Sequence, residues 1–285
     1  MPEDGPVVAR TREELRAALA STGRPRGFVA TMGALHEGHV SLLRRARAES
    51  ATVVASIFVN PRQFDRADDL AAYPRDLGSD LDVCAAAGVD VVFAPAGEEV
   101  YPPGSATTVD PGPIGRVLEG ASRPGHFVGV ATVVTILIDL VAPDRSYFGE
   151  KDGQQLVVVR RIARDLALPG AIVGCPTVRE PDGLAMSSRN ERLAPADREA
   201  AAVLRRALLA VRDAHAGGVT DAGRLRTTML EVLAREPRAH VDYVSVADPE
   251  TLVEAEGSRA GPLLVSLAVE VGGVRLIDCE ALPAG

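Results

Sequence analysis

Two histidines lie close together in a glycine-containing segment near the N-terminus. The segment reads Thr31-Met-Gly-Ala-Leu-His-Glu-Gly-His39, and it joins an apolar run expected to be a strand to a run expected to be a helix. Residues three apart on a helical turn share one face, so His36 and His39 can point at the same ligand. We expect Gly33 and Gly38 to allow close backbone approach, and the free amide groups at the helix start to favour an anion. The segment therefore predicts a phosphate site, against the plainer alternative of two surface histidines beside a flexible loop.

A second segment contains the one lysine of the chain. Lysine and arginine together number 31, and Lys151 alone among them is a lysine. It lies in Phe148-Gly-Glu-Lys-Asp-Gly-Gln-Gln155, where a strand is expected to end and a helix to begin. A compact ammonium group offers a point charge to phosphoryl oxygens, and Gln155, one turn along, can bond a small polar substrate. The alternative is a lysine–aspartate surface pair beside an exposed glutamine.

Two further segments carry polar side chains at strand ends or in a linker. Met186-Ser-Ser-Arg-Asn190 offers two hydroxyls and a guanidinium, a set suited to gripping a triphosphate. The same residues could instead cap the helix expected near Pro195. Ser56-Ile-Phe-Val-Asn-Pro-Arg-Gln-Phe64 ends a strand and places Asn60 and Gln63 beyond it. An asparagine before a proline is also a common start of a turn, so Asn60 has a purely structural alternative.

The scarce polar residue types gather in these segments. The chain has one lysine, three glutamines and two asparagines, and all six lie in the segments around Asn60, Lys151 and Asn190. The composition otherwise favours arginine, alanine, valine and glycine. Lysine and arginine are not equivalent as phosphate ligands, so the few lysine and amide side chains are candidates for positions that need their chemistry.

The elements that must position these residues follow an alternating pattern. Apolar, β-branched runs predict strands, and amphipathic or apolar runs predict the helices between them. Alternation of this kind implies a parallel, doubly wound sheet covered on both faces, in which the carboxyl ends of neighbouring strands converge on one crevice. The predicted strands are 28–31, 52–59, 89–93, 146–148 and 171–174, and the predicted helices are 11–20, 38–49, 76–87, 128–141 and 154–166.

The character of the sequence changes after Pro176. Two predicted helices, 195–216 and 220–234, precede predicted strands 241–246, 263–271 and 274–279, which suggests a smaller α+β domain. The final two strands are expected to form a hairpin that turns at Gly272-Gly273. In the first half, the proline- and glycine-rich stretch 101–125 is expected to be a loop over the site.

Composition excludes several classes of protein. The chain has 285 residues, a formal net charge of -8 and three cysteines. The negative charge gives no general attraction to nucleic acid or to an anionic membrane surface. The cysteines are far apart and form no C-x-x-C pair, which argues against a disulfide framework or a thiolate zinc site.

Membrane insertion and export are not expected either. The most apolar stretch, 127–142, is shorter than a membrane-spanning helix and contains Asp139. Met1-Pro-Glu-Asp4 lacks the basic and then apolar pattern of a signal peptide. The sequence predicts a cytoplasmic protein with no membrane and no nucleic-acid partner.

Nucleotide-binding motifs narrow the choice of chemistry. Neither Gly-x-Gly-x-x-Gly nor a P-loop occurs, so dinucleotide and P-loop interpretations are weak. His36-Glu-Gly-His39 is instead the signature of the nucleotidyl-transfer superfamily, in which paired histidines stabilise charge on the α-phosphate. Met186-Ser-Ser-Arg189 is similar to the Lys-Met-Ser-Lys-Ser loops of the same superfamily. With Tyr73-Pro-Arg75 and Gly120-Ala-Ser-Arg-Pro-Gly-His-Phe127, these motifs resemble the pantothenate synthetase family, also called pantoate:beta-alanine ligases, nearly from end to end.

This resemblance implies a fold, a reaction and partners. The implied fold is a Rossmann-like N-terminal domain over residues 1–177 and a smaller C-terminal α+β lid domain over residues 178–285, in a cytoplasmic homodimer of coenzyme A biosynthesis. The implied reaction has two steps: pantoate attacks the α-phosphate of ATP and releases pyrophosphate, and the amine of β-alanine then displaces AMP from the pantoyl adenylate. Mg²⁺ would accompany the ATP.

The resemblance also implies site residues. It gives catalytic roles to His36, His39, Lys151 and Arg189, with His39 as proton donor, while direct metal ligands remain unidentified. Gln63 and Gln155 would hold pantoate, Gln63 would also meet β-alanine, and Asn60 would complete the substrate site. The implied ATP site consists of Met32, Gly33, Ala34, Leu35, His36, Glu37, Gly38, His39, Gly149, Glu150, Lys151, Asp152, Val178, Met186, Ser187, Ser188 and Arg189.

Four positions depart from the family's usual residues. Ala30 stands where proline is common, Arg62 where methionine is frequent, and Val128 where arginine is frequent. Gly153 follows the Lys-Asp pair, where an aromatic residue is usual, and its small size is expected to remove an aromatic wall from the site.

Two rival functions make different predictions. Another adenylyltransferase of the superfamily, acting on a phosphorylated substrate, would need additional cationic residues around the acceptor pocket, whereas Gln63 and Gln155 suit a small hydroxy acid. A nucleotide-binding regulatory module without turnover predicts the loss of at least one of His36, His39 and Lys151, and all three are present.

Overall fold

The computed structural model describes residues 5–284, which form two units. The first unit comprises the described residues up to Gly149 together with Val158–Cys175, and the second comprises Glu150–Val157 and the described residues from Pro176 onward. The expectation about targeting rests on Met1–Asp4, which lie outside the described residues.

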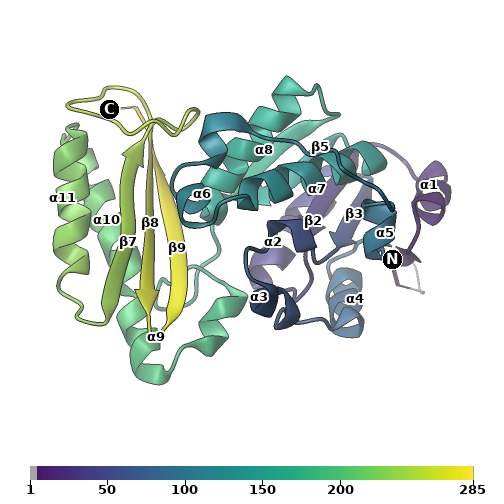
Figure 1. Ribbon diagram of the computed structural model, residues 1–285, viewed down its shortest axis with the longest axis horizontal. Helices are drawn as coiled ribbons and strands as arrows, with labels where there is room; N and C mark the ends of the chain where they lie inside the picture. Colours follow the sequence, from purple (N-terminus) through teal and green to yellow (C-terminus); the bar gives the residue numbers. More distant parts are fainter. Residues whose placement is uncertain (1–4, 285) are drawn as a thin grey trace. The chain divides into compact units, whose positions relative to one another are not determined.

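The first unit is built on a six-stranded parallel sheet in the order β1-β4-β3-β2-β5-β6. Figure 1 labels β2, β3 and β5 of this sheet. The order reverses between the adjacent strands β2 and β5, and a reversal of this kind is where ligands bind in open α/β sheets. The predicted α/β class and doubly wound sheet are therefore confirmed. The strands are β1 (Val7–Ala9), β2 (Arg26–Thr31), β3 (Thr52–Ile57), β4 (Val91–Phe93), β5 (Arg145–Gly149) and β6 (Ala171–Cys175).

Helices cover both faces of this sheet because the strands are apolar on both sides. Helix α2 packs on β2, β3 and β5 with Leu43 and Ala46 buried, while α7 packs on β2 and on α1. In the part of the chain that the structure describes, no helix is both long and apolar enough to cross a membrane. The helices are α1 (Arg12–Ala20), α2 (Glu37–Glu49), α3 (Ala67–Ala71), α4 (Leu77–Ala86), α5 (Gly97–Val100), α6 (Glu119–Ser122), α7 (His126–Val141) and α8 (Gly153–Asp165).

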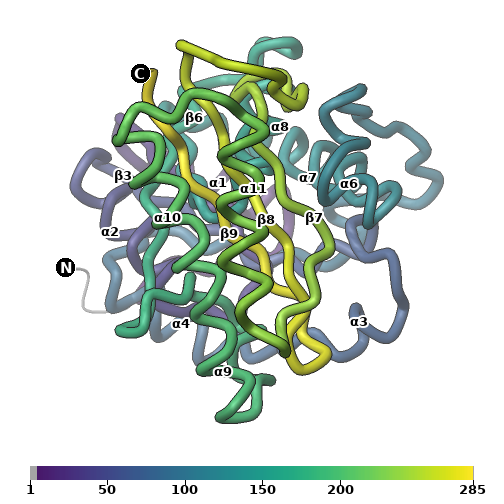
Figure 2. The backbone as a smooth tube through the Cα atoms, turned by 90° about the vertical axis from the view of Figure 1, so that its left-hand side faces the viewer, coloured from purple at the N-terminus to yellow at the C-terminus, as the bar shows by residue number. Residues whose placement is uncertain are grey.

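The second unit is a three-stranded antiparallel sheet, in the order β7-β8-β9, with helices on one face (Figure 2). Leu204, Leu208, Leu225 and Met229 of the two long helices are fully buried in a core shared with the sheet. The elements are α9 (Pro195–Ala201), α10 (Val203–Ala216), α11 (Ala222–Leu233), β7 (Ala239–Ala247), β8 (Leu263–Val271) and β9 (Val274–Leu282).

The predicted hairpin turn between the last two strands is confirmed. Val271 pairs with Val274, and the two glycines between them have φ values of 58° and 74°. Two successive residues with positive φ define the type I′ turn that a two-residue hairpin favours, and glycine adopts this conformation without steric cost.

Other predicted elements needed correction. The single helix predicted over 195–216 is two helices, since the amide of Ala202 bonds back to the carbonyl of Glu199 and closes α9 before α10 begins. The stretch 101–125 is not all loop, because it contains a 3₁₀ helix as well as α6. The 3₁₀ helices are η1 (Pro61–Gln63), η2 (Gly112–Gly115), η3 (Glu150–Asp152) and η4 (Ser188–Arg192).

Candidate active site

His36 and His39 flank the first turn of α2, directly beyond the end of β2. His36 is the N-cap residue, and its Nδ1 accepts a hydrogen bond from the amide of Gly38 at 3.1 Å. Nδ1 of His39 accepts from the amide of His36 at 3.3 Å, so the two rings close a reciprocal capping box. Their ring centroids are 4.2 Å apart.

These two hydrogen bonds determine the tautomer of each ring. A backbone N–H can only donate, so each Nδ1 must be unprotonated and must accept. A neutral imidazole then carries its proton on Nε2. Both histidines are thereby held as Nε2–H donors, which is the form that can hydrogen-bond to phosphate oxygens.

Side chains occupy the backbone amides of residues 33–35, which precede the helix. The carboxylate of Asp80, buried in α4, accepts from the amides of Ala34 at 3.1 Å and Leu35 at 2.8 Å. The amide of Gly33 donates to Thr31 Oγ1 at 3.2 Å. These amides are therefore not free for an anion in this structure, and the imidazole donors become the main candidates to meet one.

Asp80 also explains the glycine in this turn. Gly33 has a φ of +84°, and a Cβ built on it would lie 2.7 Å from Asp80 Oδ2. Both the backbone conformation and the space therefore require glycine. Sequence reasoning missed Asp80, because it comes from another helix and no local pattern links it to the turn.

The segment after β3 meets the segment after β2. Asn60, only 1% exposed, caps η1 by accepting from the amide of Arg62, and its Nδ2 donates to Gln63 Oε1 at 2.9 Å. Gln63 Nε2 lies 2.9 Å from the sulfur of Met32, in the segment that follows β2. Two segments predicted from different strands are thus side by side, as expected for the carboxyl edge of a parallel sheet.

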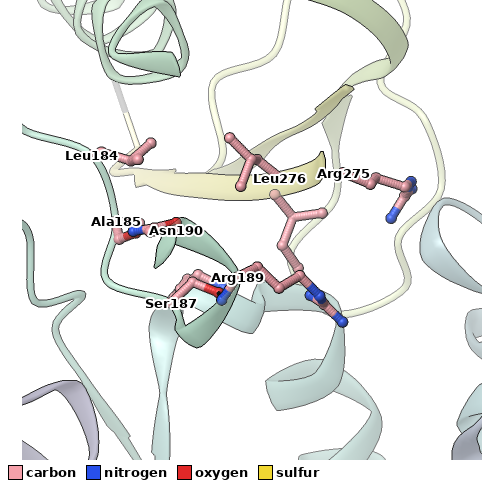
Figure 3. A pocket seen from close by; sticks show the side chains of 9 residues that line it. Leu184, Ala185, Ser187, Arg189, Asn190, Arg275 and Leu276 are labelled. Carbon is pink, nitrogen blue, oxygen red and sulfur yellow. Dashed lines mark hydrogen bonds between the residues drawn. The ribbon is translucent and has the colours of Figure 1, made fainter. Parts of the chain in front are cut away.

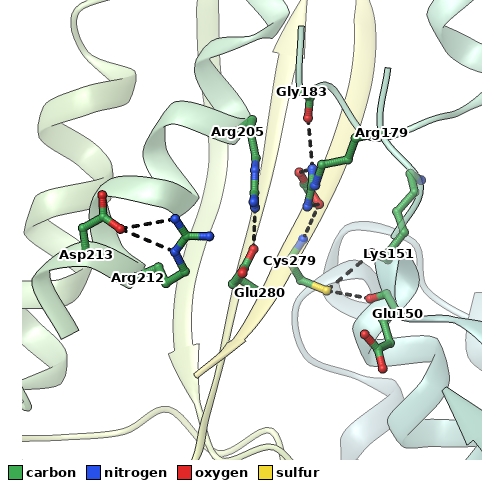
Figure 4. Close-up of polar contacts among 10 residues, drawn as sticks. Glu150, Lys151, Arg179, Gly183, Arg205, Arg212, Asp213, Cys279 and Glu280 are labelled. Carbon is green, nitrogen blue, oxygen red and sulfur yellow. Dashed lines mark hydrogen bonds and ion pairs between the residues drawn. The ribbon is translucent and has the colours of Figure 1, made fainter. Parts of the chain in front are cut away.

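Lys151 lies in η3, within the second unit, and β9 fixes its backbone. Cys279 Sγ donates to the carbonyl of Glu150 at 2.8 Å and lies 3.6 Å from the carbonyl of Lys151 (Figure 4). The Lys151 ammonium lies 3.7 Å from a carboxylate oxygen of Asp152, and the lysine side chain is 18% exposed. Gln154 is buried, whereas Gln155 is half-buried.

Gly153 faces the interior of the second unit. A Cβ at this position would lie 2.8 Å from Cys279 Sγ and 3.4 Å from Leu264. The space in which a side chain would begin is therefore filled by β8 and β9. The glycine therefore has a role in packing against Cys279, while the expected loss of an aromatic wall stays a prediction.

The segment with the two serines extends from a short hairpin. Val178 and Met186 pair through a backbone hydrogen bond of 3.0 Å, and Arg179 bridges to Ala185 inside them. Arg179 also binds the buried carboxylate of Asp278 at 2.6 and 3.1 Å, which ties the hairpin to β9.

Ser187 and Asn190 order the turn that carries Arg189. Ser187 caps η4, so these residues do not cap the helix at Pro195 as the plainer alternative supposed. Asn190 is 8% exposed and donates to Glu180 Oε1 at 2.6 Å and to the carbonyl of Ala185 at 3.0 Å. This asparagine, one of the two in the chain, therefore has a structural role.

A pocket in the second unit brings three of the predicted nucleotide residues together (Figure 3). Arg275 lines it as well, and Asp242 pairs with the Arg275 guanidinium at 2.6 Å. Sequence reasoning missed Arg275, because arginine type carries little information in so arginine-rich a chain. The lining residues are Lys151, Leu184, Ala185, Ser187, Arg189, Asn190, Arg275, Leu276 and Ile277.

Metal-ligating side chains do not cluster in the described part of the chain. Among residues 5–284 there is no group of three or more histidine, cysteine, aspartate or glutamate side chains placed to hold a metal ion.

Comparison with known proteins gives a consistent result. The family model described as pantoate-beta-alanine ligase matches residues 7–281. A pantothenate synthetase from Roseiflexus sp. (strain RS-1) is 55% identical over 277 residues, covering 97% of this chain and 99% of that protein.

Two solved structures agree over nearly the full length. Pantothenate synthetase from Thermus thermophilus superposes with a TM-score of 0.89 at 48% identity, covering 96% of this chain and 98% of that one. The pantoate-beta-alanine ligase from Francisella tularensis gives a TM-score of 0.79 at 33% identity, covering 97% of each chain. The chain belongs to the pantoate-beta-alanine ligase family.

Proposed function

We propose that this ligase, which joins pantoate and β-alanine at the expense of ATP, works through a pantoyl adenylate. In the first step a carboxylate oxygen of pantoate bonds to the α-phosphorus and the bond to the pyrophosphate oxygen breaks. In the second step the amine of β-alanine bonds to the acyl carbon, the bond to the AMP oxygen breaks, and the amine loses a proton. The observation that carries this proposal is the pair of Nε2–H histidines beyond β2, beside the segment that holds Gln63.

Adenylation activates the carboxylate of pantoate for amide formation. A carboxylate is a poor acyl donor at neutral pH, whereas an acyl adenylate offers AMP as a good leaving group. The enzyme then mainly positions reactants and neutralises charge that develops on the phosphoryl oxygens, and needs no covalent nucleophile. The Francisella tularensis relative is described as complexed with beta-gamma ATP and beta-alanine, which supports binding of these two ligands here.

In the first unit, residues Met32 to His39 are proposed to line the ATP site. His36 and His39 would donate from Nε2 to oxygens of the α-phosphate, where negative charge accumulates as the pentavalent phosphorus forms. His39 would be the donor that follows the departing pyrophosphate. Gln63, held by Asn60, would bind pantoate and later β-alanine.

In the second unit, Lys151 and Arg189 are proposed to neutralise the triphosphate, assisted by the hydroxyls of Ser187 and Ser188. Gln155 would bind pantoate. The remaining nucleotide contacts are proposed for Glu150, Asp152, Val178 and Met186 of this unit and for Gly149 of the first unit.

Mg²⁺ is proposed only as the companion of the ATP triphosphate. Magnesium bound with nucleotides keeps several waters and needs few protein ligands. We also propose a cytoplasmic homodimer in which the second unit serves as the lid; these properties come from the family resemblance.

Phosphorus NMR with ¹⁸O-labelled pantoate tests the proposal. Purified protein, Mg²⁺, ATP, β-alanine and pantoate labelled in its carboxylate are expected to give pyrophosphate and AMP, with ¹⁸O on the AMP phosphorus. Omitting β-alanine should limit the reaction to about one turnover, and omitting pantoate should abolish it. ADP and inorganic phosphate would instead establish an acyl-phosphate route, and no turnover of pantoate would overturn the substrate assignment.

A further inference from the structure

Backbone groups settle the orientation of the buried Asn60 amide. Asn60 Oδ1 lies 3.2 Å from the amide of Arg62, which can only donate, and Asn60 Nδ2 lies 3.1 Å from the carbonyl of Gly129, which can only accept. Exchanging the oxygen and nitrogen of this side chain would break both hydrogen bonds. The donor and the acceptor ends of Asn60 are therefore fixed without reference to any other side chain.

The fixed Asn60 amide in turn orients Gln63. Asn60 Nδ2 lies 2.9 Å from Gln63 Oε1 and must donate to it, so the Gln63 oxygen is turned toward Asn60. Gln63 Nε2 then lies on the other side of the carboxamide, beside the Met32 sulfur. The group that Gln63 can offer to a ligand is thus an N–H donor, which matches an acceptor such as a carboxylate or hydroxyl oxygen.

Tyr101 reaches this pair of amides from the 101–125 stretch. Its hydroxyl donates to Asn60 Oδ1 at 2.8 Å. Burial raises the pKa of Tyr101 to about 12, so the hydroxyl keeps its proton at the pH values at which enzymes work.

Arg62 holds both Tyr101 and the chain that follows it. Its guanidinium carbon lies 3.9 Å from the centroid of the Tyr101 ring. The same guanidinium donates to the carbonyls of Ser105 at 2.9 Å and Thr107 at 3.3 Å. The arginine therefore connects the Tyr101 ring to the backbone of residues 105 and 107.

We propose that Tyr101 and Arg62 are positioning residues, which through Asn60 hold the Gln63 carboxamide with its N–H groups toward the substrate. The inference rests on the proposed binding of pantoate by Gln63. The inference also specifies the ligand. The group of the substrate that faces Gln63 must be a hydrogen-bond acceptor, such as an oxygen of a carboxylic acid, and not a hydrogen-bond donor.

Kinetics of Tyr101→Phe test the proposal, because this change removes the hydroxyl and keeps the ring beneath Arg62. We expect the KM for pantoate to rise about fivefold, with kcat and the KM for ATP within about twofold, as for the loss of one hydrogen bond. Gln63→Glu, which replaces the donor by an acceptor, should lower kcat/KM for pantoate at least about a hundredfold. Tyr243→Phe, on β7 of the second unit, is the matched control and should change neither constant.

Arg62→Met shows whether the arginine acts through the tyrosine. Alone it should raise the KM for pantoate about two- to threefold, since the ring loses its cation and the loop its tether. In the double variant with Tyr101→Phe, the KM should be no higher than for Tyr101→Phe alone. If the two substitutions instead raise the KM for pantoate independently, so that their effects multiply in the double variant, Arg62 does not act through Tyr101 and the proposal is wrong.

NMR of the side-chain amides tests the relay, meaning the series of contacts from Tyr101 through Asn60 to Gln63, without an activity assay. The chain has only five carboxamides, those of Asn60, Gln63, Gln154, Gln155 and Asn190, so five NH₂ pairs are expected in a ¹⁵N–¹H spectrum. Tyr101→Phe should move the Asn60 and Gln63 signals and leave the other three in place. Unmoved signals, or an equal change in all five, would overturn the inference. Moved signals in a protein that does not turn over pantoate would confirm the relay and overturn the proposed function instead.

Discussion

His36 combines two roles in one ring. Its Nδ1 caps α2 by accepting from Gly38, and this leaves the proton on Nε2, where a phosphate oxygen can receive it in a hydrogen bond. Protonating Nδ1 would break the cap. The structural and chemical roles of the ring are therefore coupled through its tautomer, and they can be separated by substitution.

A pair of substitutions makes this separation. His36→Asn keeps a side-chain acceptor of the kind preferred at N-caps but has no Nε2–H, whereas His36→Ala has neither. We expect His36→Ala to lower the free energy of unfolding by about 1 kcal/mol and His36→Asn to lower it by less than about 0.5 kcal/mol. Both should lower single-turnover adenylate formation at least about tenfold, equivalent to about 1.4 kcal/mol of barrier.

Urea denaturation and rapid-quench measurements on both variants supply the two readouts. Equal losses of stability would contradict the capping role of Nδ1. An unchanged rate of adenylate formation in His36→Asn would contradict the role of Nε2.

At the scale of elements, three successive residues of β9 anchor separate parts of the second unit. Asp278 binds Arg179 of the serine-bearing hairpin, Cys279 binds the carbonyls around Lys151, and Glu280 pairs with Arg205 of α10 (Figure 4). In β9, Asp278 and Cys279 are buried. One strand thus fixes both predicted triphosphate-binding segments of this unit.

The fit between Gly153 and Cys279 yields a prediction for this strand. Because a Cβ at position 153 would lie 2.8 Å from Cys279 Sγ, Gly153→Ala should lower the free energy of unfolding by about 1 to 2 kcal/mol through overpacking. With Cys279→Ala present, the same change should be neutral or stabilising, since alanine favours a helix by up to about 1 kcal/mol over glycine.

Chemical denaturation of the four proteins in this double-mutant cycle measures the coupling directly. Additive effects would show that the two positions do not share space. Cys279→Ala alone serves as the control for loss of the thiol's hydrogen bond to Glu150.

Sequence periodicity was sufficient for the longer elements but not for their junctions. Buried β-branched runs such as 52–57 and the two-glycine turn at 272–273 follow local rules, and these predictions are confirmed. The break at Ala202 depends on one backbone hydrogen bond within an otherwise continuous helical pattern. β1 is three residues long, too short for a periodic signal.

The residues of the candidate site also fall into those that local sequence could suggest and those that it could not. Scarce residue types led to the prediction of Asn60, Gln63 and Lys151, whereas Asp80 and Arg275 belong to common types and Tyr101 lies outside the four predicted segments. Asp80 and Tyr101 act through contacts between segments far apart in sequence. Such contacts become visible only when the chain is folded.

At the scale of the whole molecule, each unit has its own hydrophobic core. One core cluster contains Val29 and Val53 of the parallel sheet with Leu43 of α2, and another contains Leu267 of the antiparallel sheet with Leu204 and Leu225 of the helices. A chain in which each unit buries a core of its own need not unfold in a single transition. The cysteines are distributed so that this can be tested, with Cys84 and Cys175 in the first unit and Cys279 in the second.

Thiol labelling should therefore report on each unit separately. All three cysteines are buried, and burial raises the pKa of Cys84 and of Cys279 to about 12. Only thiolates react, and unfolded cysteines have a pKa of about 8.5, so at pH 8 we expect no labelling of the folded protein and rapid labelling once a unit opens.

Pulsed alkylation along a urea gradient, read by peptide mass spectrometry, should give midpoints for Cys84 and Cys279 that differ by more than about 0.5 M, because separate cores of different size have different sensitivity to denaturant. Cys175, which packs in the same cluster as Cys84, is the internal control and should follow the Cys84 curve. Coincident curves for all three thiols would instead establish one cooperative transition. The shared helix α8, whose residues 153–157 belong to the second unit and 158–165 to the first, would then be the element to test as the cause of that coupling.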